Sequence, residues 1–534
     1  MRAWFAVFAV WLSAVSSVAF ADAPLDCKAS QPVDKYRFLR KLSLDLRGRM
    51  PAYEEYVALD GQTDVADAAI DAMLKTDEFR IVARRWHESW LWPNLGGVSF
   101  ADNATTLQQD KVSGIWFISS VTRRKAWRKG IGSESCGDWQ QTQFQGDAPV
   151  PKPIVDAAGK TLYQQDGWVM VAPYWQPDTP IKVCAFDAQV AAQGVKYACN
   201  AREGLNEGAC GCGPNLRWCW GTGVQAAVAA DLREQLLRAI DDVTTGALPY
   251  SQLLTTLGVW QSSKLLFWRK NLAQLSAFSK VWTLAGIGDP PLAADLEVSW
   301  TDATWTHALR SGSHSGILTL PGYSLRFQTN RGRANRFRIA FEGQYFVPPA
   351  TTVDTKDCEP GAADLTKACV CRHCHQVLEP LAAYFAQVSE AGTQLSTEQS
   401  LPPYDAKCDP TKQKYLSQLC LRFYVVDPKA HRPGWLLTQQ WAEPTDALHN
   451  KIIENIQAGP RGLAQASLDS GQFHATTVRN LWMILMHREM LLDPTRAEDE
   501  LPLLAQLAAE FKKNDDYRLL VRRLVHLPQY RRLR

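Results

Sequence analysis

The stretch VQAAVAADLREQLLRAIDDV, residues 224–243, has the apolar spacing of an amphipathic helix. Its charged side chains fall on one side of such a helix. Its larger apolar side chains recur every three or four positions on the other side, at Leu232, Leu236, Leu237, Ile240 and Val243. This pattern predicts a helix with one buried face, and it is the most regular of several helical patterns along the chain.

Similar patterns occur toward both ends of the sequence. VDKYRFLRKLSLDLRGRMPAYEEYVAL, residues 33–59, predicts a helix that ends at Gly48 and a second helix that opens on the acidic pair Glu54 and Glu55. Helical patterns continue to about residue 130 and resume beyond residue 436, where the last two segments predict an antiparallel pair. We therefore expect a mainly α, multi-domain helical protein.

Size and charge narrow the class of protein. The chain has 534 residues, of which 46% are hydrophobic, so it can bury a large core and should divide into several domains. Lys and Arg number 58 and Asp and Glu number 55, which gives a net charge of +3. This balance predicts no nucleic-acid partner, because nucleic-acid binding requires a concentration of positive charge.

The first residues resemble a secretory signal peptide. MRAWFAVFAVWLSAVSSVAFA combines one basic residue with a long apolar run and ends in the small-x-small site Ala19-Phe20-Ala21. No later segment has a comparable uninterrupted apolar run of the length needed to span a bilayer. We expect an exported protein, periplasmic, at the cell surface or secreted, with no transmembrane segment after signal cleavage.

Export determines how the thirteen cysteines are interpreted, because thiols in an oxidising compartment usually pair. A first group has an odd number of members: Cys27, Cys136, Cys184, Cys199, Cys210, Cys212 and Cys219. A second group comprises Cys358, Cys369, Cys371, Cys374, Cys408 and Cys420. Residues 136–223 are also rich in Gly, Pro and Gln with short strand-like pieces, which predicts a disulfide-stapled irregular or β insertion.

The most specific chemical motif lies in ACVCRHCHQVLEPLAAYF, residues 368–385. Cys371, Cys374 and His375 have the C-x-x-C-H spacing of covalent haem attachment. In such a site the two thiols add to the two vinyl groups of haem, and the adjoining imidazole binds the iron. We expect haem c as a covalent cofactor, with Cys371 and Cys374 as its attachment points and His375 as an iron ligand.

Two other interpretations of this motif remain open. One is a disulfide knot in which His375 has no chemical role. The other is a zinc site built from Cys369, Cys371, Cys374 and a histidine, although structural zinc sites usually join two separated ligand pairs.

Three blocks of the chain resemble the planctomycete-type cytochrome c domain proteins, which are large exported multi-domain proteins. RKLSLDLRGRMPAYEEY (40–56) is similar to their opening signature, and SGILTLPGYSLRFQTNRGRANRFR (315–338) with FVPP and CRHCHQVLEP is similar to their haem-bearing domain. ENIQAGPRGLA through LVRRLVHLPQYRR resembles their C-terminal helices. Glu379-Pro380 stands where Asp-Pro is common in the family, and Cys369 is an additional cysteine. The resemblance implies a mono-haem protein with a cytochrome-c-like haem segment.

These observations predict the following division of the chain: 1–21, signal peptide; 22–135, N-terminal helical domain; 136–223, Cys-rich insertion; 224–310, helical domain; 311–435, haem-bearing cytochrome-c-like domain; 436–534, C-terminal helical domain.

The remaining site residues concern the other side of the iron and the haem carboxylates. His314, Met483 and Met486 are candidates for the sixth ligand, whose identity sets the potential and reactivity of a haem. Arg331 and Arg333 are candidates for binding the haem propionates, since a guanidinium suits a carboxylate. For this arginine pair, a solvated basic loop is the alternative.

Three functions are compatible with these residues. The first is electron transfer by a mono-haem c-type cytochrome with an unidentified redox partner protein. The second is a haem-dependent oxidoreductase, either peroxidase-like or accessory to oxidative polymer degradation. The third is a cell-surface binding or structural module, in which a haem or a disulfide knot only supports the fold. Whether the protein is an enzyme stays open at this level.

Overall fold

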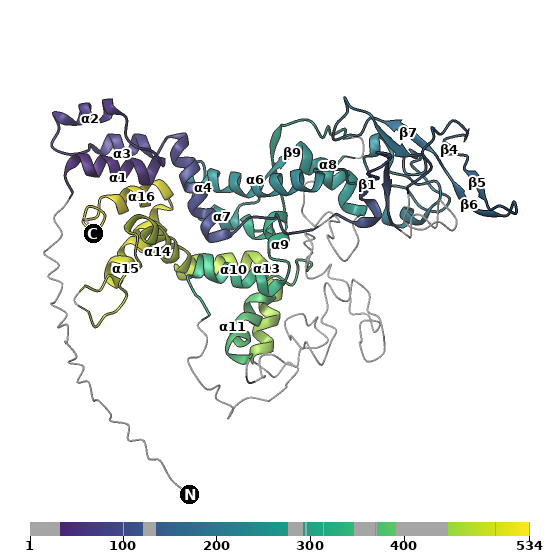
Figure 1. Cartoon of the computed structure of the whole chain (residues 1–534). Helices are drawn as coiled ribbons and strands as arrows, with labels where there is room; N and C mark the ends of the chain where they lie inside the picture. Colours follow the sequence, from purple (N-terminus) through teal and green to yellow (C-terminus); the bar gives the residue numbers. More distant parts are fainter. Residues whose placement is uncertain are drawn as a thin grey trace, which may run out of the picture.

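The computed structural model (Figure 1) describes residues 33–99, 101–120, 135–275, 292–293, 296–312, 314–346, 369, 371–390, 447–496 and 498–532. The expected signal peptide lies outside the described residues, and so do Cys27, Cys358, Cys408 and Cys420.

Four helices form the first part of the described chain: α1 (Lys35–Arg47), α2 (Tyr53–Asp60), α3 (Asp67–Met73) and α4 (Asp77–Leu91). Helix α1 begins where the Asp34 carboxylate accepts two backbone N–H bonds, and it ends at Gly48, whose φ of +67° is the left-handed conformation that glycine adopts readily. Glu54 and Glu55 lie in the first turn of α2. The expected helix end and helix start are therefore confirmed.

Most of the strands lie between residues 101 and 184. After the short 3₁₀ turn η1 (Asn103–Thr105) come β1 (Leu107–Gln109), β2 (Trp116–Ile118), β3 (Phe144–Gln145), β4 (Ala148–Pro149), β5 (Lys152–Val155), β6 (Thr161–Gln165), β7 (Trp168–Val171) and β8 (Ile181–Cys184). Four of them form a sheet in the order β1-β2-β8-β7, in which only the β2–β8 pair is parallel. The pairs β3–β4 and β5–β6 form two separate antiparallel hairpins.

The sequence pattern was wrong for β1 and β2, because it predicted helix there. Trp116 of β2 pairs with Val183 of β8, far along the chain, and the Leu107 N–H donates to the Trp220 carbonyl oxygen. Strands of three residues have little stability of their own, so tertiary pairing overrides local pattern.

Three disulfides staple the region that follows β2. They join Cys136 to Cys184, Cys199 to Cys210 and Cys212 to Cys219. Two short 3₁₀ turns, η2 (Arg202–Asn206) and η3 (Pro214–Leu216), lie between the bonded cysteines. All six described cysteines of the first group are thus paired, and the odd member of that group is Cys27.

The middle of the chain is built around one long helix. The elements are α6 (Val224–Thr244), α7 (Gln252–Thr255), β9 (Gly258–Ser262), α8 (Ser263–Phe267), the π turn η4 (Trp268–Leu272), the 3₁₀ turn η5 (Ala273–Leu275) and β10 (Trp305–Leu309), which pairs antiparallel with β9. The apolar residues expected on one face of α6 are all buried: Leu232, Leu236, Leu237, Ile240 and Val243. The amphipathic pattern is confirmed.

The last part of the described chain is helical. Its elements are η6 (Gly316–Thr319), α9 (Pro321–Arg326), α10 (Asn330–Glu342), α11 (Arg372–Ala383), α13 (Ala447–Ser470), α14 (Gln472–Met486), α15 (Leu501–Asn514) and α16 (Tyr517–Val525). Helix α13 is interrupted at Gly459, whose φ is +61°, and Pro460 follows. Two residues connect α15 to α16, and the two helices contact each other.

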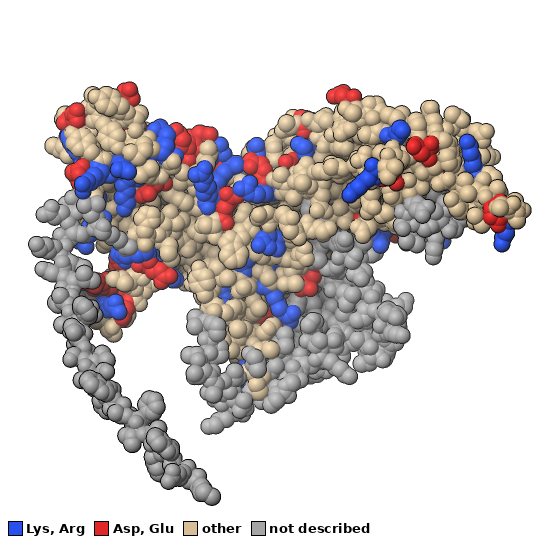
Figure 2. All heavy atoms as spheres, viewed as in Figure 1, with Lys and Arg blue, Asp and Glu red and all other residues tan. Residues whose placement is uncertain are grey.

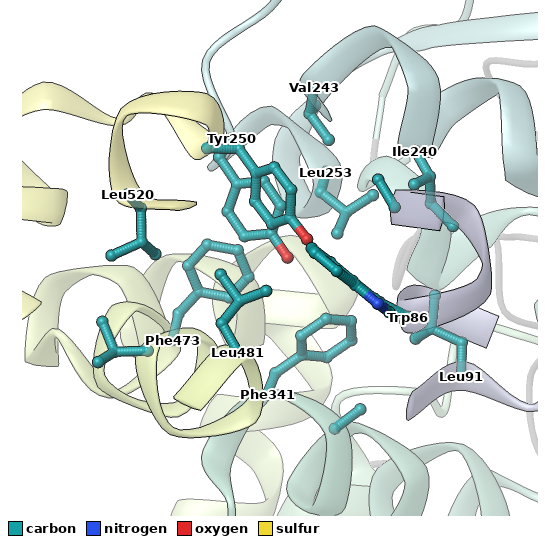
Figure 3. Packing of buried hydrophobic residues seen from close by; sticks show 14 of the residues in the cluster. Trp86, Leu91, Ile240, Val243, Tyr250, Leu253, Phe341, Phe473, Leu481 and Leu520 are labelled. Atoms are coloured by element: carbon teal, nitrogen blue, oxygen red, sulfur yellow. The ribbon is translucent and has the colours of Figure 1, made fainter. Parts of the chain in front are cut away.

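One hydrophobic core joins helices that are far apart in the sequence (Figure 3). Trp86 of α4, Ile240 of α6, Phe341 of α10 and Phe473 of α14 belong to the same buried cluster, with Tyr250 between them. Figure 1 shows the C-terminal helices α14 to α16 beside α1 to α4. The described residues between 101 and 220, here called the β region, lie at the opposite end of the molecule. The helical ranges that the sequence separates into domains therefore share a core.

Polar contacts close this helical body. The Arg84 guanidinium of α4 lies 2.9 Å from Glu234 of α6 and also bonds Asp241. The Tyr530 hydroxyl, next to the C-terminus, donates to the Asp45 carboxylate of α1 at 2.7 Å. The two ends of the described chain are thus held together by a buried phenol and a carboxylate.

Positive and negative side chains are interspersed over the described surface that Figure 2 presents. Within the described part of the chain, no helix is both long and apolar enough to cross a membrane.

Burial of His87 in this core makes folding stability depend on pH. His87 is fully buried, with Nδ1 2.7 Å from the Ala83 carbonyl oxygen and Nε2 2.9 Å from the Tyr250 hydroxyl. Burial lowers the pKa of His87 from 6.5 to about 4, since the charged form loses its hydration. Between these two values the unfolded chain binds the proton and the folded chain does not. Stability is therefore intact above pH 6.5 and declines toward pH 4.

We predict that this histidine accounts for a loss of about 3 kcal/mol in the free energy of unfolding as the pH falls through this window. Denaturant unfolding at a series of pH values would measure it, with His87→Gln as the comparison. Gln keeps a partner for the Tyr250 hydroxyl but does not titrate, so its stability should decline less. Parallel pH profiles for the two proteins would contradict the assignment.

Candidate functional site

The C-x-x-C-H motif forms the beginning of α11. Cys371 occupies the position before the first helical residue, and its carbonyl oxygen accepts the backbone N–H groups of Cys374 and His375 at 3.1 and 3.0 Å. Residues at i, i+3 and i+4 lie on the same face of a helix. The first helical turn therefore presents two sulfurs and one imidazole on one face, and all three side chains are partly exposed.

The sulfurs of the motif differ from every other described cysteine. Cys371 and Cys374 are free thiols, although they are separated by only two residues. Six other described cysteines form the three disulfides of the β region, and Cys369 is also disulfide-bonded. Two thiols at the haem-attachment spacing thus coexist with oxidised cysteines in the same chain.

His375 is held by a carboxylate one turn further along α11. Its Nδ1 contacts Oε1 of Glu379, at the i+4 position, and the same oxygen accepts a hydrogen bond from Arg331 Nε at 2.7 Å. The Glu379 side chain is 1% exposed, whereas those of His375 and Arg331 are 19% and 21% exposed. The buried carboxylate therefore lies between two partly exposed side chains, Arg331 of α10 and His375 of α11.

Arg331 lies on α10, which packs directly against α11. The start of α10 is capped by the Thr329 hydroxyl, which accepts the Gly332 N–H at 3.0 Å. The loop expected around Arg331 and Arg333 is therefore a helix. Arg338, two turns after Arg331 on the same side of α10, is 9% exposed and lies near Cys374. Burial lowers the pKa of Arg338, and the nearby Cys374 sulfur opposes this shift.

Arg333 lies inside the protein and not in contact with solvent. It is fully buried, and burial lowers the pKa of its guanidinium to about 10. Its Nη1 donates to Asn330 Oδ1 at 2.7 Å and to the Val388 carbonyl oxygen at 3.1 Å. Its Nη2 donates to the carbonyl oxygens of Ser324 and Ser389 at 3.1 and 2.9 Å. The alternative of a solvated basic loop is wrong for this residue.

His314 is also buried and hydrogen-bonded. Its Nδ1 lies 3.3 Å from both Arg310 Nη1 and Thr319 Oγ1. A guanidinium can only donate, so Nδ1 accepts the hydrogen bond from Arg310. In the neutral imidazole the proton is therefore on Nε2. To bind iron through Nε2, His314 would need the other tautomer, with the proton on Nδ1. The observed contacts therefore favour a structural role for His314.

The two methionine candidates lie on α14. Met486 is 4% exposed and belongs to the shared helical core, whereas Met483 is 45% exposed. Helix α14 packs mainly against α10, α13, α15 and α16, while α11 packs mainly against α10 and α13. The structure therefore brings Cys371, Cys374, His375 and Arg331 together. Met483 and Met486 lie on α14, whose main contacts do not include α11.

A second set of possible metal donors lies in the β region. Cys136, Cys184 and Asp166 are buried, and their ligand atoms lie within 4.8 Å of one another. The two sulfurs are bonded to each other, however, and Asp166 Oδ2 accepts the Phe186 N–H at 2.9 Å. These donors are committed to a disulfide and a backbone hydrogen bond, so we assign no metal to them.

Two residues of the α11 site were missed by the sequence interpretation. Glu379 was noted only as part of a Glu-Pro pair, and Arg338 was not considered. The i+4 spacing of His375 and Glu379 was available in the sequence, because residues four apart on a helix are neighbours. No local sequence pattern indicated that α10 packs against α11.

Comparison with known proteins adds no identification: no family model matches the chain, and no significant match occurs among curated proteins or solved structures.

A disulfide map of the purified chain tests the distinction between its cysteines. We predict linked peptides for Cys136–Cys184, Cys199–Cys210 and Cys212–Cys219 after proteolysis without reduction. Mass spectrometry should assign no disulfide bond to Cys371 or Cys374, and in the peptide that Cys369 shares with Cys371 the bonded cysteine should be Cys369. A Cys371–Cys374 disulfide in the mature, exported chain would contradict this assignment and support the disulfide-knot interpretation.

Proposed function

We propose that this protein is an exported mono-haem c-type cytochrome whose role is electron transfer. The observation that carries the proposal is the arrangement at the start of α11, where Cys371, Cys374 and His375 share one face and the two sulfurs remain thiols. The other nearby cysteine, Cys369, is oxidised. The donor set of two thiols and one imidazole, at this spacing, fits covalent haem.

Each residue of the motif has a distinct part in holding the haem. Cys371 and Cys374 would hold the haem through two thioethers, each made by adding one S–H group to a vinyl group with no net change in oxidation state. His375 would supply an imidazole nitrogen to the iron. A bound haem supplies a one-electron couple; the chain supplies the attachment, the axial ligand and the surroundings that set its potential.

The two rival sites fit the cysteines less well. A disulfide knot would oxidise Cys371 and Cys374, but both are free thiols. The zinc site considered above takes Cys369 as one of its ligands, and this sulfur is already bonded to another cysteine. The haem interpretation uses two thiols and the adjoining histidine without competing for Cys369.

The oxidised cysteines support export. Three disulfides within the β region suit an oxidising compartment, where c-type haem attachment also takes place. The signal-like first residues and the resemblance to planctomycete-type cytochrome c domain proteins point in the same direction. A redox partner protein follows from electron transfer, since one haem must receive and deliver its electron.

Loss of the thiols tests the haem assignment. The chain would be expressed with c-type maturation factors, and Cys371→Ala/Cys374→Ala should lose its covalent haem, measured by the pyridine haemochrome after acid-acetone extraction. The matched control is Cys199→Ala/Cys210→Ala, which removes a disulfide of the β region and should keep the pigment. A wild-type chain that is colourless after extraction would reject the proposal.

Binding of carbon monoxide or peroxide to the iron distinguishes an electron-transfer protein from a haem enzyme. An electron-transfer haem has both axial positions filled, so we predict that carbon monoxide binds the reduced protein slowly or not at all and that peroxide is not turned over. Visible spectra of the reduced protein with and without carbon monoxide measure this. Rapid binding would instead favour a haem-dependent oxidoreductase with an open position.

A further inference from the structure

The Glu379 carboxylate is an unusual group to bury. Its side chain is 1% exposed, one oxygen contacts both Arg331 and His375, and the other oxygen is buried with no hydrogen-bond partner in the described structure. A buried ion pair often contributes less to stability than apolar side chains of the same size. Stability alone therefore gives a weak reason for a carboxylate at this position.

The contacts determine which nitrogen of His375 carries a proton. Arg331 Nε can only donate, so Glu379 Oε1 accepts its bond, and the same oxygen accepts from the second neighbour, His375 Nδ1. The proton is accordingly on Nδ1, and Nε2 keeps its lone pair for a metal. Because His375 and Glu379 are one turn apart on α11, the helix itself maintains this pairing.

We infer that Glu379 is a positioning residue that orients the His375 imidazole, fixes its tautomer and lowers the reduction potential of the haem. This inference rests on the proposed function, since it concerns the same axial ligand. A carboxylate that accepts the Nδ1–H bond increases the electron donation from Nε2. Greater donation stabilises the ferric state over the ferrous state, so the potential falls. Arg331 balances the charge of the buried carboxylate.

Graded substitutions at Glu379 separate a hydrogen-bond effect from a charge effect. Glu379→Gln removes the charge but keeps an oxygen that can accept from Nδ1, whereas Glu379→Leu removes both. Glu342→Gln is the matched control, because Glu342 is a half-buried carboxyl on α10 that bonds Ser467 instead of the site. All variants would be made as full chains with c-type maturation factors.

Spectroelectrochemical titration would measure the midpoint potential of each haem-loaded protein, and the ferric EPR spectrum would report the strength of the axial field. We expect a positive shift in Glu379→Gln, a larger positive shift in Glu379→Leu, and no shift in Glu342→Gln. The g-values should change in the same order. Glu379→Gln is nearly isosteric, so it provides the comparison even if Glu379→Leu fails to mature.

The other outcomes overturn the inference. Potentials in both Glu379 variants that equal that of Glu342→Gln would show that the carboxylate does not act on the ligand. Equal positive shifts in Gln and Leu would show that only its charge acts, and not its hydrogen bond. A wild-type chain without covalent haem would reject the proposed function and this inference together, whereas a pigmented chain with unshifted variants would reject the inference alone.

Discussion

The arrangement of the site depends on one fully buried guanidinium. Arg333 of α10 donates to the carbonyl oxygens of Val388 and Ser389, which follow α11, and of Ser324 in α9. A buried charge that loses its hydrogen-bond partners costs several kcal/mol, so these three segments are held in one relative position. Arg331, two residues earlier on α10, is thereby brought to Glu379 and the C-x-x-C-H turn.

The chemistry of the chain rests on two populations of cysteine. One population forms three disulfides that staple a region of small sheets and 3₁₀ turns. The other consists of Cys371 and Cys374, which stay reduced at the start of a helix packed between α10 and α13. This contrast distinguishes the C-x-x-C-H turn, with its two free thiols, from the β region, which disulfides hold together.

Local patterns predicted those elements whose residues interact with near neighbours. The end of α1 at Gly48 and the buried face of α6 follow from backbone conformation and helical periodicity, and both are confirmed. The strands β1 and β2 were mistaken for helix, because β2 also pairs with β8, which lies more than 60 residues away, and β1 joins the same sheet through β2. The helical ranges predicted as separate domains share a core, because Trp86 and Phe473, from distant parts of the chain, belong to one buried cluster.

The sequence by itself determined which atoms can react, since the spacing of Cys371, Cys374 and His375 on one helical turn is a local property. Only the tertiary structure decided their surroundings: the free state of the two thiols, the burial of Arg333, and the contact that brings Arg331 of α10 to Glu379. Helical spacing is a short-range consequence of backbone geometry, whereas burial and charge pairing depend on segments that fold together from distant parts of the chain.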